Sequence, residues 1–252
     1  MLVYLIVCPL VFLAGFVDSI AGGGGLISLP AFFFAGLPAH VAIGTNKLSS
    51  TLGTSVSTAR YFKQGFVPVE MAVCSSVAAL CGSLIGANLS LLISESVIRH
   101  MMIVVLPVVA FYVLKNKDFG ESRQTGTLKK EVQLLISMGA GFVIGIYDGL
   151  YGPGTGTFLL LILTGLAKLP VTEASGLTKV INLSSNVAAL ITFIIHGTVY
   201  YPLGLAAAVF CIVWSLFVRL IFWRSIALSN VNSGSLKSAT ACKLLRCASK
   251  YG

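Results

Sequence analysis

Long apolar runs, separated by short polar or glycine-containing segments, fill most of this 252-residue chain. A helix needs roughly 20 mostly apolar residues to cross a bilayer, and a much shorter apolar piece indicates a half-helix or a re-entrant element. The pattern therefore predicts an all-α, polytopic helical bundle of spans and half-spans. The expected helices cover residues 2–20, 26–36, 43–62, 69–93, 97–114, 132–150, 156–168, 177–196 and 202–223.

The first apolar stretch is broken by four consecutive glycines, Gly22 to Gly25, which follow Asp18 closely. Backbone N–H and C=O groups freed by such a break cannot stay unpaired in lipid, so the break must be buried in protein or line a wet cavity. The apolar piece that follows, 26–36, has about half the length of a span. We therefore expect a broken or re-entrant helix with a candidate site inside the membrane.

The same pattern recurs in the second half of the chain. Asp148 lies 130 residues after Asp18, and Gly152-Pro153-Gly154-Thr155 takes the place of the Gly22 to Gly25 loop. After a two-residue insertion, the further matches are Pro38 with Pro170, Gly44 with Gly176, Lys47 with Lys179, and Gly65 with Gly197. The chain is therefore predicted to be an internal duplication. Its expected parts are a first transmembrane repeat (1–114), a connector (115–131), a second, incomplete repeat (132–223) and a basic C-terminal tail (224–252).

Composition places the chain among integral membrane proteins. Hydrophobic residues make up 56% of it and charged residues 10%, which is too few charges to cover a soluble globule of this size. Residues 2–20 lack a basic start and a small-residue cleavage pattern, so we interpret them as a retained helix rather than a signal peptide. The bilayer is therefore an expected partner of the chain.

Basic residues gather in the connector 115–131 and in the segment that follows Arg219, and the net charge is +9. The positive-inside rule then predicts an inner-membrane protein whose connector and tail are cytoplasmic. Beside so many predicted spans, we interpret this basic character as a topology signal and expect no nucleic-acid partner. The six cysteines form no CxxC pair and have no histidine at ligand spacing, so we expect no disulfide framework, no metal site and no cofactor.

Duplicated halves with helices broken at equivalent positions are typical of secondary transporters, whose site lies near the membrane midplane between the repeats. The half-helix after a break presents free N–H groups and a partial positive charge, which suits a small anion. Each repeat adds one lysine beside hydroxyl and amide donors. The candidate substrate-binding residues are Gly22, Gly23, Gly24, Gly25, Asn46, Lys47, Ser49, Ser50, Gly152, Gly154, Thr178, Lys179, Asn182, Ser185 and Asn186.

Each of these features also has a structural interpretation. A lysine at the end of an apolar segment can be a snorkelling interface anchor. Serines and asparagines can hold helices together, and glycines can serve close packing alone. Asp18 and Asp148 are the acids of the two break motifs, and an acid inside a membrane is a functional candidate by default. They are interpreted either as proton carriers that couple anion export to the proton gradient, or as caps for the loop N–H groups that follow them.

Two other classes of function have to be considered. Tyr147-Asp148 within a membrane helix is half of the pattern of intramembrane aspartyl proteases, whose paired carboxylates activate water. The Gly-x-Gly-Asp half of that pattern is absent, and transport explains a duplicated glycine loop where proteolysis does not. The sequence therefore indicates that the chain is not an enzyme. The remaining alternative is an anion channel, which would conduct without proton dependence, or a scaffold, which would show no flux.

The chain resembles the TauE/SafE family of membrane transporters, in particular its YfcA-like branch, over residues 1 to about 210. The signature segments read GFVDSIAGGGGLISLPAFFFAGLPAHVAIGTNKLSS and YDGLYGPGTGTF, with LTKVINLSSNVAAL downstream. The resemblance implies a multi-pass inner-membrane permease of two homologous halves, linked to sulfite, sulfonates and other small organosulfur or organic anions. Family members usually continue with a Gly- and Arg-containing segment and a final span. This chain departs there, because no span-length apolar run follows Trp223. We interpret its end either as a soluble extension or as the result of truncation or alteration.

Overall fold

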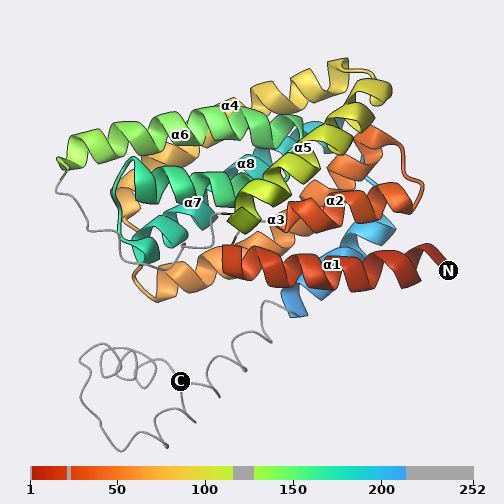
Figure 1. Ribbon diagram of the computed structural model, residues 1–252, viewed down its shortest axis with the longest axis horizontal. Coiled ribbons are helices and arrows are strands. Elements are labelled where there is room, and N and C mark those ends of the chain that lie inside the picture. The colour runs from red at the N-terminus through yellow and green to blue at the C-terminus, as the bar shows by residue number, and fades with distance from the viewer. Residues whose placement is uncertain (1, 22–23, 116–127, 214–252) are drawn as a thin grey trace, which may run out of the picture. The chain divides into compact units, whose positions relative to one another are not determined.

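The computed structural model describes residues 2–21, 24–115 and 128–213, and the regular elements among these residues are all helices (Figure 1). The first half contains α1 (Leu2–Ala21), α2 (Gly25–Phe34), α3 (Ala39–Lys63), α4 (Val69–Leu92) and α5 (Glu95–Lys115). The second half contains α6 (Lys130–Leu150), α7 (Thr155–Gly165), α8 (Val171–Ile195) and a further helix, Tyr201–Val213. The all-α fold class is confirmed. The predicted tail, 224–252, lies outside the described residues.

Corresponding helices of the two predicted repeats have matching lengths. α1, α2 and α3 comprise 20, 10 and 25 residues, and α6, α7 and α8 comprise 21, 11 and 25. The chain from Met1 to Ser215 forms one compact unit, so the two repeats are packed together rather than separated into independent domains. The lengths support the internal duplication, which stays a prediction.

α3 and α8 begin earlier than the sequence pattern predicted, at Ala39 instead of residue 43 and at Val171 instead of residue 177. Pro38 and Pro170 stand immediately before them with extended backbone angles. Proline suits the start of a helix because its φ angle is already restricted and the first turn has no use for its missing N–H. The prolines therefore start the longer helices as well as ending the preceding segments.

α4 and α6 run side by side and cross at close range through small residues (Figure 1). A Cβ atom built on Gly82 or Gly86 of α4 would collide with a carbonyl oxygen of α6. In return, a Cβ atom on Gly141 or Gly145 of α6 would lie 2.8 Å from a carbonyl oxygen of α4. Small residues are the usual means by which membrane helices approach each other closely. The small-residue face predicted for 69–93 therefore packs against α6.

Replacing Gly86 with alanine is expected to lower the free energy of unfolding by about 1–3 kcal/mol, because the added methyl group would force α4 and α6 apart. The measurement is the melting temperature of the purified protein in detergent. The matched control is Gly139→Ala on α6, where an added Cβ atom meets no heavy atom within 4 Å. Equal melting temperatures for the two variants would contradict the close crossing.

The polar interior of the described bundle is supplied mainly by α3 and α8, which pack against each other. Its buried polar side chains on these helices are Thr45, Asn46, Lys47, Ser49, Thr51, Thr54, Ser57, Thr58, Thr178, Lys179, Asn182, Ser185, Asn186 and Thr192. Among the described helices, α4, α6 and α8 are long and apolar enough to cross a membrane, whereas α2 and α7 are shorter apolar helices. Each short helix follows a break, and α2 packs against α1 and α3 while α7 packs against α6 and α8.

Candidate functional site

The two helix breaks lie in contact with each other. α1 ends at Ala21 and α2 begins at Gly25, while α6 ends at Leu150 and α7 begins at Thr155. A Cβ atom built on Gly25 would lie 3.3 Å from the Cα atom of Pro153. Gly22 and Gly23 lie outside the described residues. The N-termini of both short helices therefore open toward the same region of the bundle.

Two ion pairs connect the predicted repeats. Lys47 Nζ on α3 lies 2.8 Å from Asp148 Oδ1 on α6, and Lys179 Nζ on α8 lies 3.0 Å from Asp18 Oδ2 on α1. Each pair thus joins a lysine of one repeat to the break-motif acid of the other. Each aspartate is held by a lysine and not by the second aspartate, an arrangement unlike the shared-proton carboxylate pair of an aspartyl protease.

The Lys47–Asp148 pair is enclosed in a dense polar network. Its side chains are 1% and 3% exposed. Thr155 Oγ1 lies 2.8 Å from Asp148 Oδ1 and 2.6 Å from the Gly152 backbone oxygen, and these two acceptors share its single hydrogen. Ser185 Oγ donates to Asp148 Oδ2 at 2.6 Å. Lys47 Nζ also donates to Asn186 Oδ1 at 3.0 Å. A charge this deeply buried is tolerated only when it is paired and hydrogen-bonded, and both carboxylate oxygens meet that condition.

The Lys179–Asp18 pair is more open. The Asp18 side chain is 25% exposed, and that of Lys179 is 6% exposed. Lys179 Nζ also donates to the backbone oxygen of Asp18 at 2.7 Å. This carbonyl belongs to the last four residues of α1, whose oxygens have no partner within the helix. Lys179 therefore stabilises the end of the broken helix in addition to neutralising the carboxylate.

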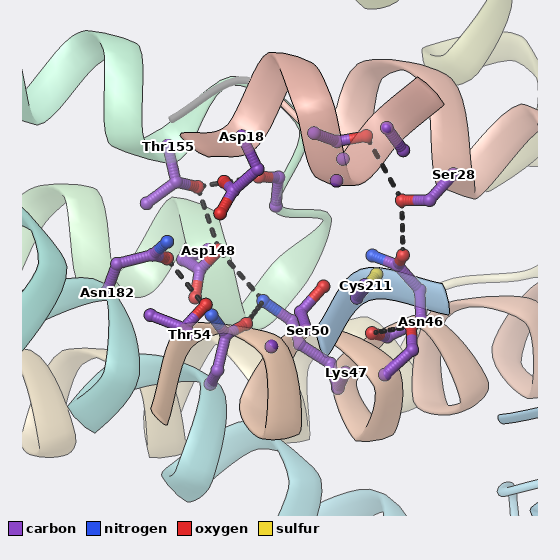
Figure 2. A pocket seen from close by; sticks show the side chains of 18 residues that line it. Asp18, Ser28, Asn46, Lys47, Ser50, Thr54, Asp148, Thr155, Asn182 and Cys211 are labelled. Carbon is purple, nitrogen blue, oxygen red and sulfur yellow. Dashed lines mark hydrogen bonds and ion pairs between the residues drawn. The ribbon is translucent and has the colours of Figure 1, made fainter. Parts of the chain in front are cut away.

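A polar cavity of about 40 Å³ lies between the breaks and the two ion pairs (Figure 2). One water needs roughly 10–15 Å³ by this measure, so the cavity has room for a few waters or a comparably small solute. The predicted site residues that line it are Asp18, Gly24, Gly25, Asn46, Lys47, Ser49, Ser50, Asp148, Gly152, Asn182 and Asn186. The structure thus brings candidates from both halves of the chain to one place.

Four other predicted residues do not line the cavity. Lys179 binds Asp18, and Ser185 binds Asp148. Gly154 has a φ angle of +81° directly before α7, a conformation that favours glycine, so its position serves the backbone turn. Thr178 is buried on α8. Lys179, Ser185 and Gly154 therefore support the site from outside its lining.

Sequence reasoning missed part of the cavity lining, namely Ala14, Gly15, Ser28, Gly53, Thr54, Thr155 and Cys211. Ser28 Oγ donates to Asn46 Oδ1 at 2.6 Å, which orients a predicted site residue. Ser28 and Thr155 sit in the first turns of the two short helices, and a search for hydroxyls at those positions would have found them. Cys211 comes from Tyr201–Val213, and its arrival at the site depends on tertiary packing. Among the described residues, no group of three or more His, Cys, Asp or Glu could hold a metal ion.

This chain is similar in sequence to several known proteins. The family model described as sulfite exporter TauE/SafE matches residues 7–222. A probable membrane transporter protein, ORF9, from Sinorhizobium sp is 35% identical and covers 77% of this chain and 73% of its own length. The probable membrane transporter protein YfcA of Escherichia coli (strain K12) is 31% identical over 76% of this chain and 70% of its own. No solved structure matches. The chain therefore belongs to the sulfite exporter TauE/SafE family and is a membrane transporter, not an enzyme.

Proposed function

We propose that this transporter exports a small oxyanion, such as sulfite or a sulfonate, across the inner membrane with the help of protons. The observation that carries the proposal is the meeting of two helix breaks and two lysine–aspartate pairs at one buried polar cavity. The positive-inside rule supports a topology in which the connector 115–131 and the basic tail face the cytoplasm.

The cavity offers the donors that a dehydrated oxyanion requires. The N-termini of α2 and α7 carry backbone N–H groups without partners inside the helix, together with a partial positive charge. Side chains of Ser50, Thr54 and Asn182 add hydroxyl and amide groups to the same space, whereas the Ser49 hydroxyl donates to the Asn46 backbone oxygen. Sulfite and sulfonates present three oxygens that accept such bonds, and both are small enough to suit a cavity of about 40 Å³.

The charges around the cavity support a role for protons. Two lysines and two aspartates sum to zero, so an entering anion has to compete with a carboxylate for an ammonium group. Protonation of one aspartate would remove that competition, which is the general way in which nearby charges link two binding events. The family description names sulfite, and this chain's substrate is therefore best sought among small sulfur oxyanions.

The test is flux into proteoliposomes that contain the purified protein, across a panel of sulfite, sulfate, sulfonates and carboxylates. We expect saturable flux of sulfite or a sulfonate that speeds up when the same anion is present on the opposite side. Flux that does not saturate and ignores the opposite side would indicate the channel alternative. The absence of flux for every anion of the panel would leave the scaffold alternative and overturn the proposal.

A further inference from the structure

The two lysine–aspartate pairs are equivalent in the predicted duplication but unequal in surroundings. The Asp148 carboxylate receives three donors, from Lys47, Thr155 and Ser185, and is 3% exposed. Among the described residues, the donor to the Asp18 carboxylate is Lys179, and the Asp18 side chain is 25% exposed. The first pair is therefore locked in place, whereas the second retains room for its carboxylate to change protonation state.

The different surroundings of the two aspartates correspond to sequence differences between the two predicted repeats. The alignment that matches Asp18 with Asp148 also matches Gly25 with Thr155, 130 residues apart. The alignment that matches Lys47 with Lys179, 132 residues apart, matches Gly53 with Ser185. The two hydroxyl side chains that contact the Asp148 carboxylate thus correspond to glycines in the first predicted repeat. Glycine has no side-chain donor for the Asp18 carboxylate.

Asp18 also separates the cavity from its lysine. Asp18 lines the cavity (Figure 2). Lys179 is not part of the lining, and its ammonium group donates to the Asp18 carboxylate. The other charged or titratable groups around Asp18 are Lys47 on α3, Asp148 on α6 and Cys211 on Tyr201–Val213. The cavity residues from the start of α2 and α7 are glycine, serine and threonine. The Lys47 ammonium group stays paired with Asp148. The positive charge that loses its partner when Asp18 is protonated is therefore that of Lys179.

We propose that Asp18 and Lys179 form a shared site for one proton and one anion. The Lys47–Asp148 pair then has a structural role only and stays intact during transport; we call it the strut. When Asp18 takes up a proton, its negative charge disappears and the ammonium group of Lys179 is left free to bind the anion. Lys179 keeps its bond to the Asp18 backbone oxygen, which does not depend on the protonation of the side chain. This inference rests on the proposed function and adds which pair binds the substrate and how the proton is linked to it.

The sign of the coupling follows from the geometry. Because the proton and the anion favour each other at this pair, each must raise the affinity of the other by the same factor. The two ligands then cross the membrane together, as in a symporter. During export, the proton leaves with the anion, so the drive comes from the anion's own gradient rather than from inward proton flow. The membrane potential adds to this drive only for an anion with more than one negative charge, because a proton and a monovalent anion together carry no net charge.

The experiment uses proteoliposomes of the full chain with a pH-sensitive dye inside and an inward gradient of methanesulfonate, whose charge is constant over the pH range used. The lumen should acidify as methanesulfonate enters, and the uptake rate should rise by about 5- to 150-fold from mildly alkaline to mildly acidic pH. In Asp18→Asn, methanesulfonate should enter without acidification and without this pH dependence. The exposed acid at the start of α4 gives the control Glu70→Gln, which should stay coupled.

Methanesulfonate entry with lumen alkalinisation, or with no pH change, would overturn the shared site while leaving anion transport intact. Retained coupling in Asp18→Asn would overturn it as well. If that variant does not fold, the pH of a weakly buffered detergent solution of the original chain is measured while methanesulfonate is added. Methanesulfonate binding should remove protons from solution. Proton release or no pH change would refute the inference. Failure of the original chain to move either sulfite or methanesulfonate would instead refute the proposed function, and the shared site with it.

Discussion

Replacing Lys47 with alanine is expected to destabilise the protein by about 3–5 kcal/mol, the usual consequence of removing one partner from a buried ion pair. Asp148 would remain 3% exposed with a negative charge and only hydroxyl donors around it. It cannot turn to solvent, because Thr155 and Ser185 hold its two oxygens and α6 is fixed against α4 through glycine contacts. The measurement is the melting temperature, and the yield of monodisperse protein, in detergent.

A second substitution separates the loss of the charge partner from the loss of packing. Adding Asp148→Asn to Lys47→Ala removes the stranded charge but keeps the shape of the side chain, so most of the lost stability should return. Lys63→Ala is the matched control, because Lys63 is an exposed lysine at the end of the same helix. A Lys47→Ala variant as stable as Lys63→Ala would contradict the assignment of this pair as a strut.

The helix breaks could be predicted from the sequence because their cause is local. Gly22 to Gly25 and Gly152 to Thr155 interrupt apolar runs whatever the rest of the chain does, and each is followed by a half-length apolar segment. The matching of Lys47 with Lys179 identified both lysines as candidates, because the same residue stood at equivalent positions of two repeats. The helix starts at Ala39 and Val171 were missed because the predicted ranges did not use Pro38 and Pro170 as helix-start signals.

The pairing of the charges could not be predicted in this way. Lys179 binds an aspartate 161 residues away, and no pattern within one helix indicates that each lysine contacts the acid of the opposite repeat. The sequence left Asp18 and Asp148 as proton carriers or as caps of their own loops. In the structure, their carboxylates accept hydrogen bonds from lysines and, for Asp148, from hydroxyls on α7 and α8. Such contacts depend on how the repeats pack, which is a property of the whole chain.

Replacing Lys179 with alanine is expected to reduce anion flux at subsaturating concentration by about 10- to 100-fold, which corresponds to the loss of a charge-assisted hydrogen bond of about 1.5–3 kcal/mol. The cost in stability should be smaller than that of Lys47→Ala, because Asp18 is 25% exposed and can be hydrated when its partner is gone. The measurement is initial methanesulfonate flux into proteoliposomes, normalised to the amount of correctly inserted protein.

Lys179→Arg is the informative companion variant, because arginine keeps the positive charge and can still reach the end of α1. It should restore a large part of the flux if the charge itself attracts the anion. If Lys179 served only to cap the last carbonyls of α1, both variants would change the melting temperature and leave flux per folded molecule unchanged. The proposed shared site predicts opposite rankings of the two lysines: Lys179 should have the larger effect on flux, and Lys47, whose aspartate is more deeply buried, the larger effect on stability. Equal effects of both lysines on both quantities would show that the two repeats act symmetrically.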